Sequence, residues 1–127
     1  MKEMQTPLHK VQGLGAAHSG TGHFWRERVT ALALVPLTLW FLYAAIGLAG
    51  VSEAHAVGYL SHPLNAILMV AFVTVSLYHM NLGLQVVIDD YVHGAGARIL
   101  LLLVVRFIVV ATGAFALFAL IRIAGQN

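Results

Sequence analysis

The sequence contains no cysteine and few charged residues. Without cysteine, the chain can form no disulfide, hold no thiolate-ligated iron–sulfur cluster and attach no haem covalently. Any redox metal held by this chain would therefore need histidine as its ligand. Lysine, arginine, aspartate and glutamate make up 9% of the 127 residues, against about 25% in soluble domains. The net charge of +2 forms no basic stripe with interleaved aromatics, which argues against nucleic-acid binding.

Apolar residues make up 60% of the chain, and the mean hydropathy is +0.86. Three apolar segments cover residues 29–50, 64–88 and 99–121. Each has roughly the 20 residues that a helix needs to cross the hydrocarbon core of a bilayer. Pro36 lies inside the first segment, where a transmembrane helix tolerates it with a local bend. The sequence therefore predicts an all-α membrane protein with three transmembrane helices.

Residues 1–23 are polar, rich in Gly and His, and lack the apolar run of a cleavable signal peptide. We expect them to form a flexible cytoplasmic arm, and residues 24–127 to form the three-helix membrane domain. Four basic residues precede the first helix: Lys2, Lys10, Arg26 and Arg28. The first loop has no Lys or Arg. The positive-inside rule thus places the N-terminus and the Gly-rich loop at 89–98 in the cytoplasm. Because residues 1–23 also differ from the Arg-rich, acid-free transit peptides of organelles, we expect a protein of the bacterial inner membrane.

His79 is an ionisable residue inside the second apolar segment, about ten residues before its cytoplasmic end. At about 1.5 Å per residue this is about 15 Å deep, near the centre of the bilayer. Such residues are costly in lipid and are often functional. His79 is either a metal ligand or a buried histidine bonded to a neighbouring helix. Gly83, one turn later, leaves room for a flat macrocycle, or is simply a small packing residue.

Asp89, Asp90 and Tyr91 follow where the second helix leaves the membrane. They can be interfacial anchors, since tyrosine is enriched at that level. They can also form a quinone site, in which the phenol donates to a quinone carbonyl and a carboxylate orients the phenol or passes protons. If the helix continues, Asp90 lies within roughly 20° of the face of His79 and about 16 Å further along the axis.

The residues His79, Gly83, Gln85, Val86, Val87, Asp90, Tyr91 and Val92, in this spacing, resemble the hydrophobic membrane anchor subunit of bacterial succinate dehydrogenase, or complex II, of the D type. The resemblance extends over about 24–121, and residues 1–23 show nothing to match. It implies that His79 is an axial ligand of one haem b, shared with a second anchor subunit. It also implies that Tyr91 and Asp90 bind ubiquinone, that Arg28 (or Arg26) lies near the haem propionates, and that Arg98 opens the third helix. His93 and Arg106 receive no role.

The resemblance further implies a flavoprotein subunit, an iron–sulfur subunit and a second anchor subunit as partners. Electrons from succinate would then reach ubiquinone at the anchor, and this chain would not be catalytic alone. Three alternatives stay open. The chain could be the anchor of a fumarate reductase or of another quinone-linked dehydrogenase. It could be an anchor that has lost its haem. It could also be a small membrane structural protein without redox function.

Overall fold

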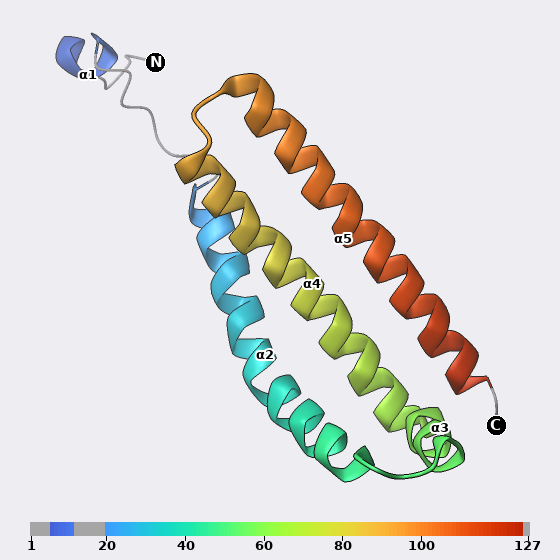
Figure 1. The fold of residues 1–127 in the computed structure, drawn as a ribbon. Helices are drawn as coiled ribbons and strands as arrows, with labels where there is room; N and C mark the ends of the chain where they lie inside the picture. The colour runs from blue at the N-terminus through green and yellow to red at the C-terminus, as the bar shows by residue number, and fades with distance from the viewer. Residues whose placement is uncertain (1–5, 12–19, 126–127) are drawn as a thin grey trace.

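A computed structural model describes residues 6–11 and 20–125. The described residues form five helices and no strand: α1 (Pro7–Val11), α2 (Gly20–Leu48), α3 (Glu53–Ser61), α4 (Pro63–Tyr91) and α5 (Ala95–Ala124) (Figure 1). The long helices α2, α4 and α5 have 29, 29 and 30 residues, and each is long and apolar enough to span a membrane. The predicted class, an all-α protein with three candidate membrane spans, is therefore confirmed.

The three long helices extend beyond the apolar segments that predict them. At about 1.5 Å per residue each is about 44 Å long, against about 30 Å of hydrocarbon core. α2 already begins at Gly20, so residues 20–23 of the expected arm are helical. Asp89, Asp90 and Tyr91 form the last turn of α4, and α5 begins at Ala95. The prediction of a loop over 89–98 is therefore wrong, because only residues 92–94 connect the two helices.

α3 lies inside the stretch expected to be a polar break between the first two spans. Its first turn is capped by Ser52, whose hydroxyl oxygen accepts from the backbone N–H of His55 at 3.4 Å. At its other end, the Ser61 hydroxyl donates to the backbone oxygen of Ile123 at 2.8 Å. α3 therefore fastens the end of the bundle where α2 and α5 finish (Figure 1).

α4 is the central helix, and it packs against α2 on one side and α5 on the other (Figure 1). The rings of Phe41 and Phe72 stack between α2 and α4 with centroids 4.4 Å apart. Between α4 and α5, a Cβ added to Gly113 would lie 3.4 Å from the Leu77 side chain. Small residues in transmembrane helices allow such a close approach. α2 changes direction part-way along its length, and Pro36 lies in its middle (Figure 1).

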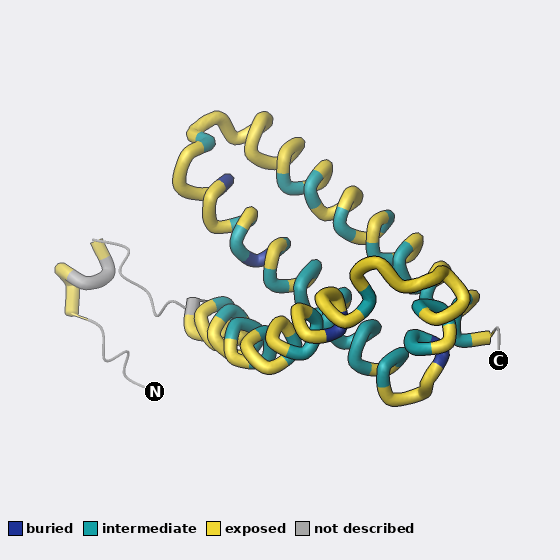
Figure 2. Tube along the Cα trace, turned by 60° about the horizontal axis from the view of Figure 1, so that its bottom comes forward, coloured by how far each residue is buried: buried dark blue, intermediate teal, exposed yellow. Residues whose placement is uncertain are grey.

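The three-helix layer has almost no enclosed core. Of the described residues, only Ala44, Ser61, Leu82 and Ile88 are buried, and most of the tube is exposed or intermediate (Figure 2). The large apolar side chains therefore face lipid or other chains. The start of α2 and the turn at 92–94 lie at one end of the layer, as the predicted topology requires (Figure 1). The cytoplasmic location of that end stays a prediction, as does the flexible arm, much of which falls outside the described residues.

Candidate functional site

His79 lies on the side of α4 that meets α2, and it is half-buried. Its Nδ1 atom is 2.9 Å from the hydroxyl oxygen of Thr30 on α2. The sequence did not single out Thr30, because 49 residues separate it from His79. The alternative reading of His79 as a histidine bonded to a neighbouring helix is thus correct for one ring nitrogen.

The other ring nitrogen, Nε2, is unpaired within the part of the chain that the structure describes. No buried side-chain nitrogen or oxygen of those residues lacks a partner, so Nε2 reaches the surface of the helix layer. The described residues also contain no group of three or more His, Cys, Asp or Glu side chains that could hold a metal ion. A metal at His79 would therefore need its other ligands from elsewhere.

The contact with Thr30 also fixes the level of His79 along the bundle. Thr30 lies two to four residues after Arg28, Glu27 and Arg26, where the charged part of α2 ends and its apolar part begins. Charged residues favour the membrane boundary. His79 therefore lies level with the start of the apolar part of α2, and its depth in the bilayer stays a prediction.

Gly83 lies one turn after His79 and is half-buried. A Cβ built on it would meet no atom within 4 Å. The expected room for a flat group beside His79 is therefore present. Gly47 and Gly58 are equally open, so this space permits a macrocycle at Gly83 without identifying one.

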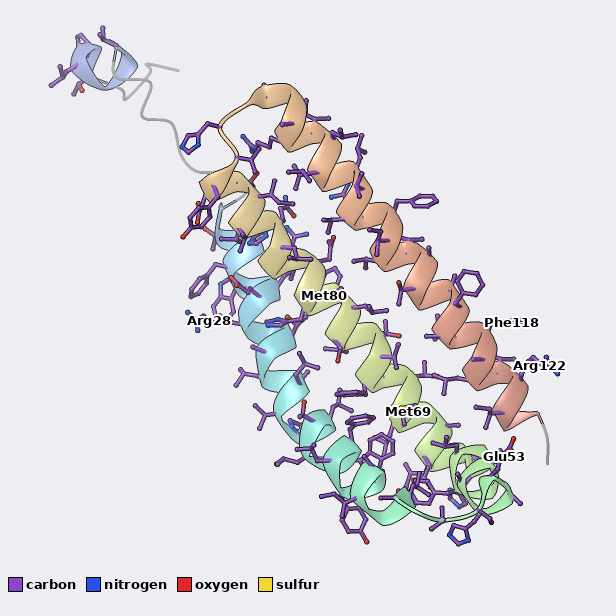
Figure 3. All side chains as sticks on the ribbon, viewed as in Figure 1. Arg28, Glu53, Met69, Met80, Phe118 and Arg122 are labelled. Atoms are coloured by element: carbon purple, nitrogen blue, oxygen red, sulfur yellow. The ribbon has the colours of Figure 1, made fainter. Side chains whose placement is uncertain are left out.

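Arg26 and Arg28, near the start of α2, lie differently relative to the contact between Thr30 and His79. Arg28 is exposed and lies on the outer side of α2 (Figure 3), with its guanidinium 5.2 Å from the centroid of the Phe24 ring. At about 100° per residue, Arg28 is about 160° around the helix from Thr30, whereas Arg26 is about 40° away. Arg26 donates from Nε to the backbone oxygen of Gly22 at 3.0 Å. Helical geometry thus brings Arg26, more than Arg28, to the face of α2 that meets His79.

Asp90 and Tyr91 lie at the exposed end of α4, and Tyr91 is 78% exposed. Because α4 continues through both residues, Asp90 shares the helix face of His79, as expected for an unbroken helix. Neither side chain has a hydrogen-bond partner among the described residues, so no bond joins them to each other. The paired carboxylate is that of Asp89, which accepts from Arg98 Nε at 2.7 Å.

Arg106 lines a pocket of about 250 Å³ between α4 and α5, together with Tyr78 and Asn81. The remaining lining is largely apolar. His93 lies exposed in the turn between these helices. Neither residue contacts His79, Asp90 or Tyr91 through a hydrogen bond or ion pair within the described ranges.

Comparison with known proteins gives a consistent family. The family model described as succinate dehydrogenase/fumarate reductase transmembrane subunit matches residues 2–113. The chain is 34% identical over 114 residues to the succinate dehydrogenase hydrophobic membrane anchor subunit of Paracoccus denitrificans, covering 88% of each chain. It is 33% identical over 110 residues to the protein of the same description from Rickettsia bellii (strain RML369-C), covering 87% of this chain and 88% of the relative. The succinate dehydrogenase membrane anchor subunit of Reclinomonas americana is 32% identical over 95 residues, or 72% of this chain and 79% of the relative. No solved structure gives a significant match.

The family match differs in extent from the resemblance seen in the sequence. It begins at residue 2, within the arm that showed nothing to match, and it ends at Gly113, before the end of α5. It includes α2, the whole of α4 and the turn that follows. The family match argues against the alternative of a small membrane structural protein, while the redox role of the chain stays a prediction. The chain belongs to the family of succinate dehydrogenase/fumarate reductase transmembrane subunits.

Proposed function

We propose that this chain is a membrane anchor subunit of a bacterial succinate dehydrogenase, located in the inner membrane. It docks a flavoprotein and an iron–sulfur subunit, together with a second anchor subunit, and contributes to the site where ubiquinone is reduced. The family match and the identity to anchor subunits over nearly nine tenths of the chain support this proposal. The open helix layer supports the need for partner chains, because its apolar side chains are mostly exposed.

The observation that carries the redox part of the proposal is the state of His79. One ring nitrogen is held by Thr30, while the other is unpaired and reaches the surface. This is the arrangement of a metal-ligating histidine, whose second nitrogen is fixed by an outer hydrogen bond. His79 would hold one axial position of a haem b, and a histidine of the second anchor subunit would hold the other. A haem bound in this way can accept and return single electrons.

Gly83 and an arginine complete the part of this site that the chain supplies. The open space at Gly83 would take the edge of the macrocycle. Arg28 would lie near the propionates, since a guanidinium at the membrane boundary can bind a carboxylate in bidentate fashion. Arg26 is the alternative, and its position one turn from Thr30 supports it.

Replacing His79 tests the haem assignment. In the purified complex, His79→Ala should remove or strongly alter the low-spin b-type absorption spectrum. His55→Ala is the matched control, because His55 lies on α3 at the other end of the bundle. An assembled His79→Ala complex with an unchanged spectrum and an unchanged haem potential would show that His79 is not a haem ligand.

The exposed end of α4 supports the quinone part of the proposal. Reduction of a quinone to a quinol takes two electrons and two protons, so the site must touch both the protein and water. The Tyr91 hydroxyl would donate to a quinone carbonyl, and the Asp90 carboxylate would pass protons from the aqueous side. Both groups are exposed and unpaired among the described residues, so they are available to a ligand or to the iron–sulfur partner.

Tyr91→Phe removes only the hydroxyl and should weaken quinone binding by about 0.5–1.5 kcal/mol, or roughly two- to tenfold. Turnover should fall by more, because the bond strengthens as charge builds on the quinone oxygen. Assembly, haem content and succinate oxidation with an upstream artificial acceptor should be retained. Tyr43→Phe is the control, because Tyr43 is similarly exposed, at 76%, and lies near the C-terminal end of α2. Wild-type quinone turnover and inhibitor sensitivity in Tyr91→Phe would make Tyr91 an interfacial anchor only.

The second candidate function is the anchor of a fumarate reductase, which the description of the family also covers. The same residues would then pass electrons from a quinol toward fumarate. The assembled complex separates the two functions through its rates of succinate oxidation with ubiquinone and of fumarate reduction with a low-potential quinol. A faster second reaction would favour the fumarate reductase.

A further inference from the structure

The Thr30 hydroxyl makes three close polar contacts. Its oxygen lies 2.8 Å from the backbone oxygen of Arg26, 3.0 Å from that of Glu27 and 2.9 Å from His79 Nδ1. The first two contacts are the usual habit of a helical threonine, which donates to a carbonyl three or four residues earlier. The third joins α2 to α4.

The number of protons decides which way the bond to His79 runs. A hydroxyl has one proton to donate and two lone pairs to accept with. Carbonyl oxygens only accept, so the short contacts with Arg26 and Glu27 require that proton. With that proton directed to the carbonyls, the Thr30 oxygen is left to accept from His79, and this pattern favours the tautomer with the imidazole proton on Nδ1. In a neutral imidazole, Nε2 is left with its lone pair. The tautomer is assigned here from the pattern of contacts.

In this tautomer, the lone pair of Nε2 points to the surface of the helix layer. Nε2 is the ring nitrogen that is unpaired and reaches the surface of the layer. The opposite tautomer would direct an N–H outward and could not ligate iron without losing that proton. The bond to Thr30 also restricts rotation of the ring, because its acceptor is fixed to the backbone of α2 through the contacts with Arg26 and Glu27.

We propose that Thr30 is a positioning residue for the haem ligand, an inference that rests on the proposed role of His79. Its hydroxyl accepts from Nδ1–H, holds the neutral tautomer that presents Nε2, and fixes the orientation of the ring. Because the acceptor is a neutral hydroxyl and not a carboxylate, it raises the basicity of the imidazole only moderately. α2 therefore contributes to the haem site through a residue that does not touch the haem iron.

The competing explanation is that Thr30 only joins two helices. Hydrogen bonds between polar side chains are common between transmembrane helices and stabilise them modestly. That role concerns packing and predicts no change in a correctly assembled haem. A positioning role predicts changes at the haem itself, since outer hydrogen-bond partners of metal ligands typically affect metal affinity by about 10- to 100-fold.

The test uses the assembled complex with Thr30→Val, Thr30→Ala and Thr30→Ser. Valine keeps the branched shape and removes the hydroxyl, and serine keeps the hydroxyl. Thr38→Val is the matched control, because Thr38 lies two turns further along α2 and is exposed. The readouts are haem per complex, the low-spin electron paramagnetic resonance signal of the oxidised haem and its midpoint potential.

Thr30→Val should raise the midpoint potential, since a less basic imidazole stabilises the oxidised iron less, and it should shift the resonance signal. Haem retention in detergent should fall about tenfold or more, and Thr30→Ser should restore all three values.

Wild-type potential and resonance in an assembled Thr30→Val complex would overturn the proposal. Failure of both Thr30→Val and Thr30→Ala to assemble would also count against it, because the hydroxyl would then serve helix packing. If His79→Ala keeps its haem, the proposed function of His79 fails; if it loses haem while Thr30→Val changes nothing, only the positioning role fails.

Discussion

Breaking the ion pair between Asp89 and Arg98 should weaken ligand binding at the quinone site slightly, and high salt should reduce the difference from wild type. Arg98 Nε lies 2.7 Å from Asp89 Oδ1, and the pair joins the last turn of α4 to the first turn of α5 across residues 92–94. Their side chains are 34% and 49% exposed, for Asp89 and Arg98 respectively. Exposed pairs of this kind contribute about 0.2–1 kcal/mol, because water screens the charges and two long side chains lose freedom. The upper limit of this energy corresponds to about a fivefold change in the affinity of a ligand whose binding depends on the turn at 92–94.

A double-mutant cycle measures this coupling in the assembled complex. Asp89→Asn and Arg98→Gln should each weaken quinone-site inhibitor binding by no more than about fivefold. The double variant should bind the inhibitor as well as the single variant that binds it less tightly, because either change alone already removes the ion pair. The difference from wild type should shrink at about 1 M ionic strength, where the screening length falls to about 3 Å.

Asp90→Asn is the comparison for the Asp89 variant. Asp90 has no ion-pair partner among the described residues, so its substitution should lower quinone turnover with little dependence on salt. A loss of quinone reduction beyond about a hundredfold in Asp89→Asn would refute this reasoning, because Asp89 would then act directly in the site. Additive effects of the two single substitutions would show that the observed pair carries no coupling.

Two further predictions follow from the helix contacts. Arg28→Leu should lower haem occupancy or shift the haem potential, with haem content per complex as the measurement; the same effect in Arg26→Leu but not in Arg28→Leu would assign the role to the arginine nearer Thr30. Gly113→Ala should be tolerated, because its Cβ would lie 3.4 Å from the flexible end of Leu77, whereas Gly113→Ile should overpack the α4–α5 contact at a cost of about 1–3 kcal/mol. Thermal dissociation of the complex in detergent measures the Gly113 pair, and equal stability of Gly113→Ile and wild type would contradict the predicted close packing.

The existence of the three long helices could be predicted from apolar length, but their ends could not. Apolar runs report where lipid begins, whereas the backbone hydrogen bonds of a helix continue through polar residues. The helix α2 therefore includes the charged residues Arg26, Glu27 and Arg28, and α4 includes Asp89 and Asp90. α3 had a usable signal in Ser52 followed by Glu53, which is a capping residue before an acidic first turn. This helix was not predicted, because it is short and lies in the polar stretch between two spans.

The candidate site could be predicted only as far as one helix carries it. His79, Gly83 and Asp90 lie on one face because their spacing fits the helical repeat, and α4 is unbroken through all three. Spacing along α4 says nothing about which residue of α2 lies opposite, because that depends on how far one helix is shifted along the other. Such a shift is set by packing, including the stacked rings of Phe41 and Phe72.

That shift explains why the sequence does not reveal Thr30. With Phe41 against Phe72, Thr30 is eleven residues earlier on α2 and His79 is seven later on antiparallel α4, distances of about 16 Å and about 10 Å along the two axes. The unequal distances fit the change in direction of α2 near Pro36, which lies between the two contacts (Figure 1). The bend thus brings the charged end of α2 level with His79. A histidine at that level has Arg26 within about one helical turn of its contact residue Thr30, which supports Arg26 as the arginine nearer a group bound at His79.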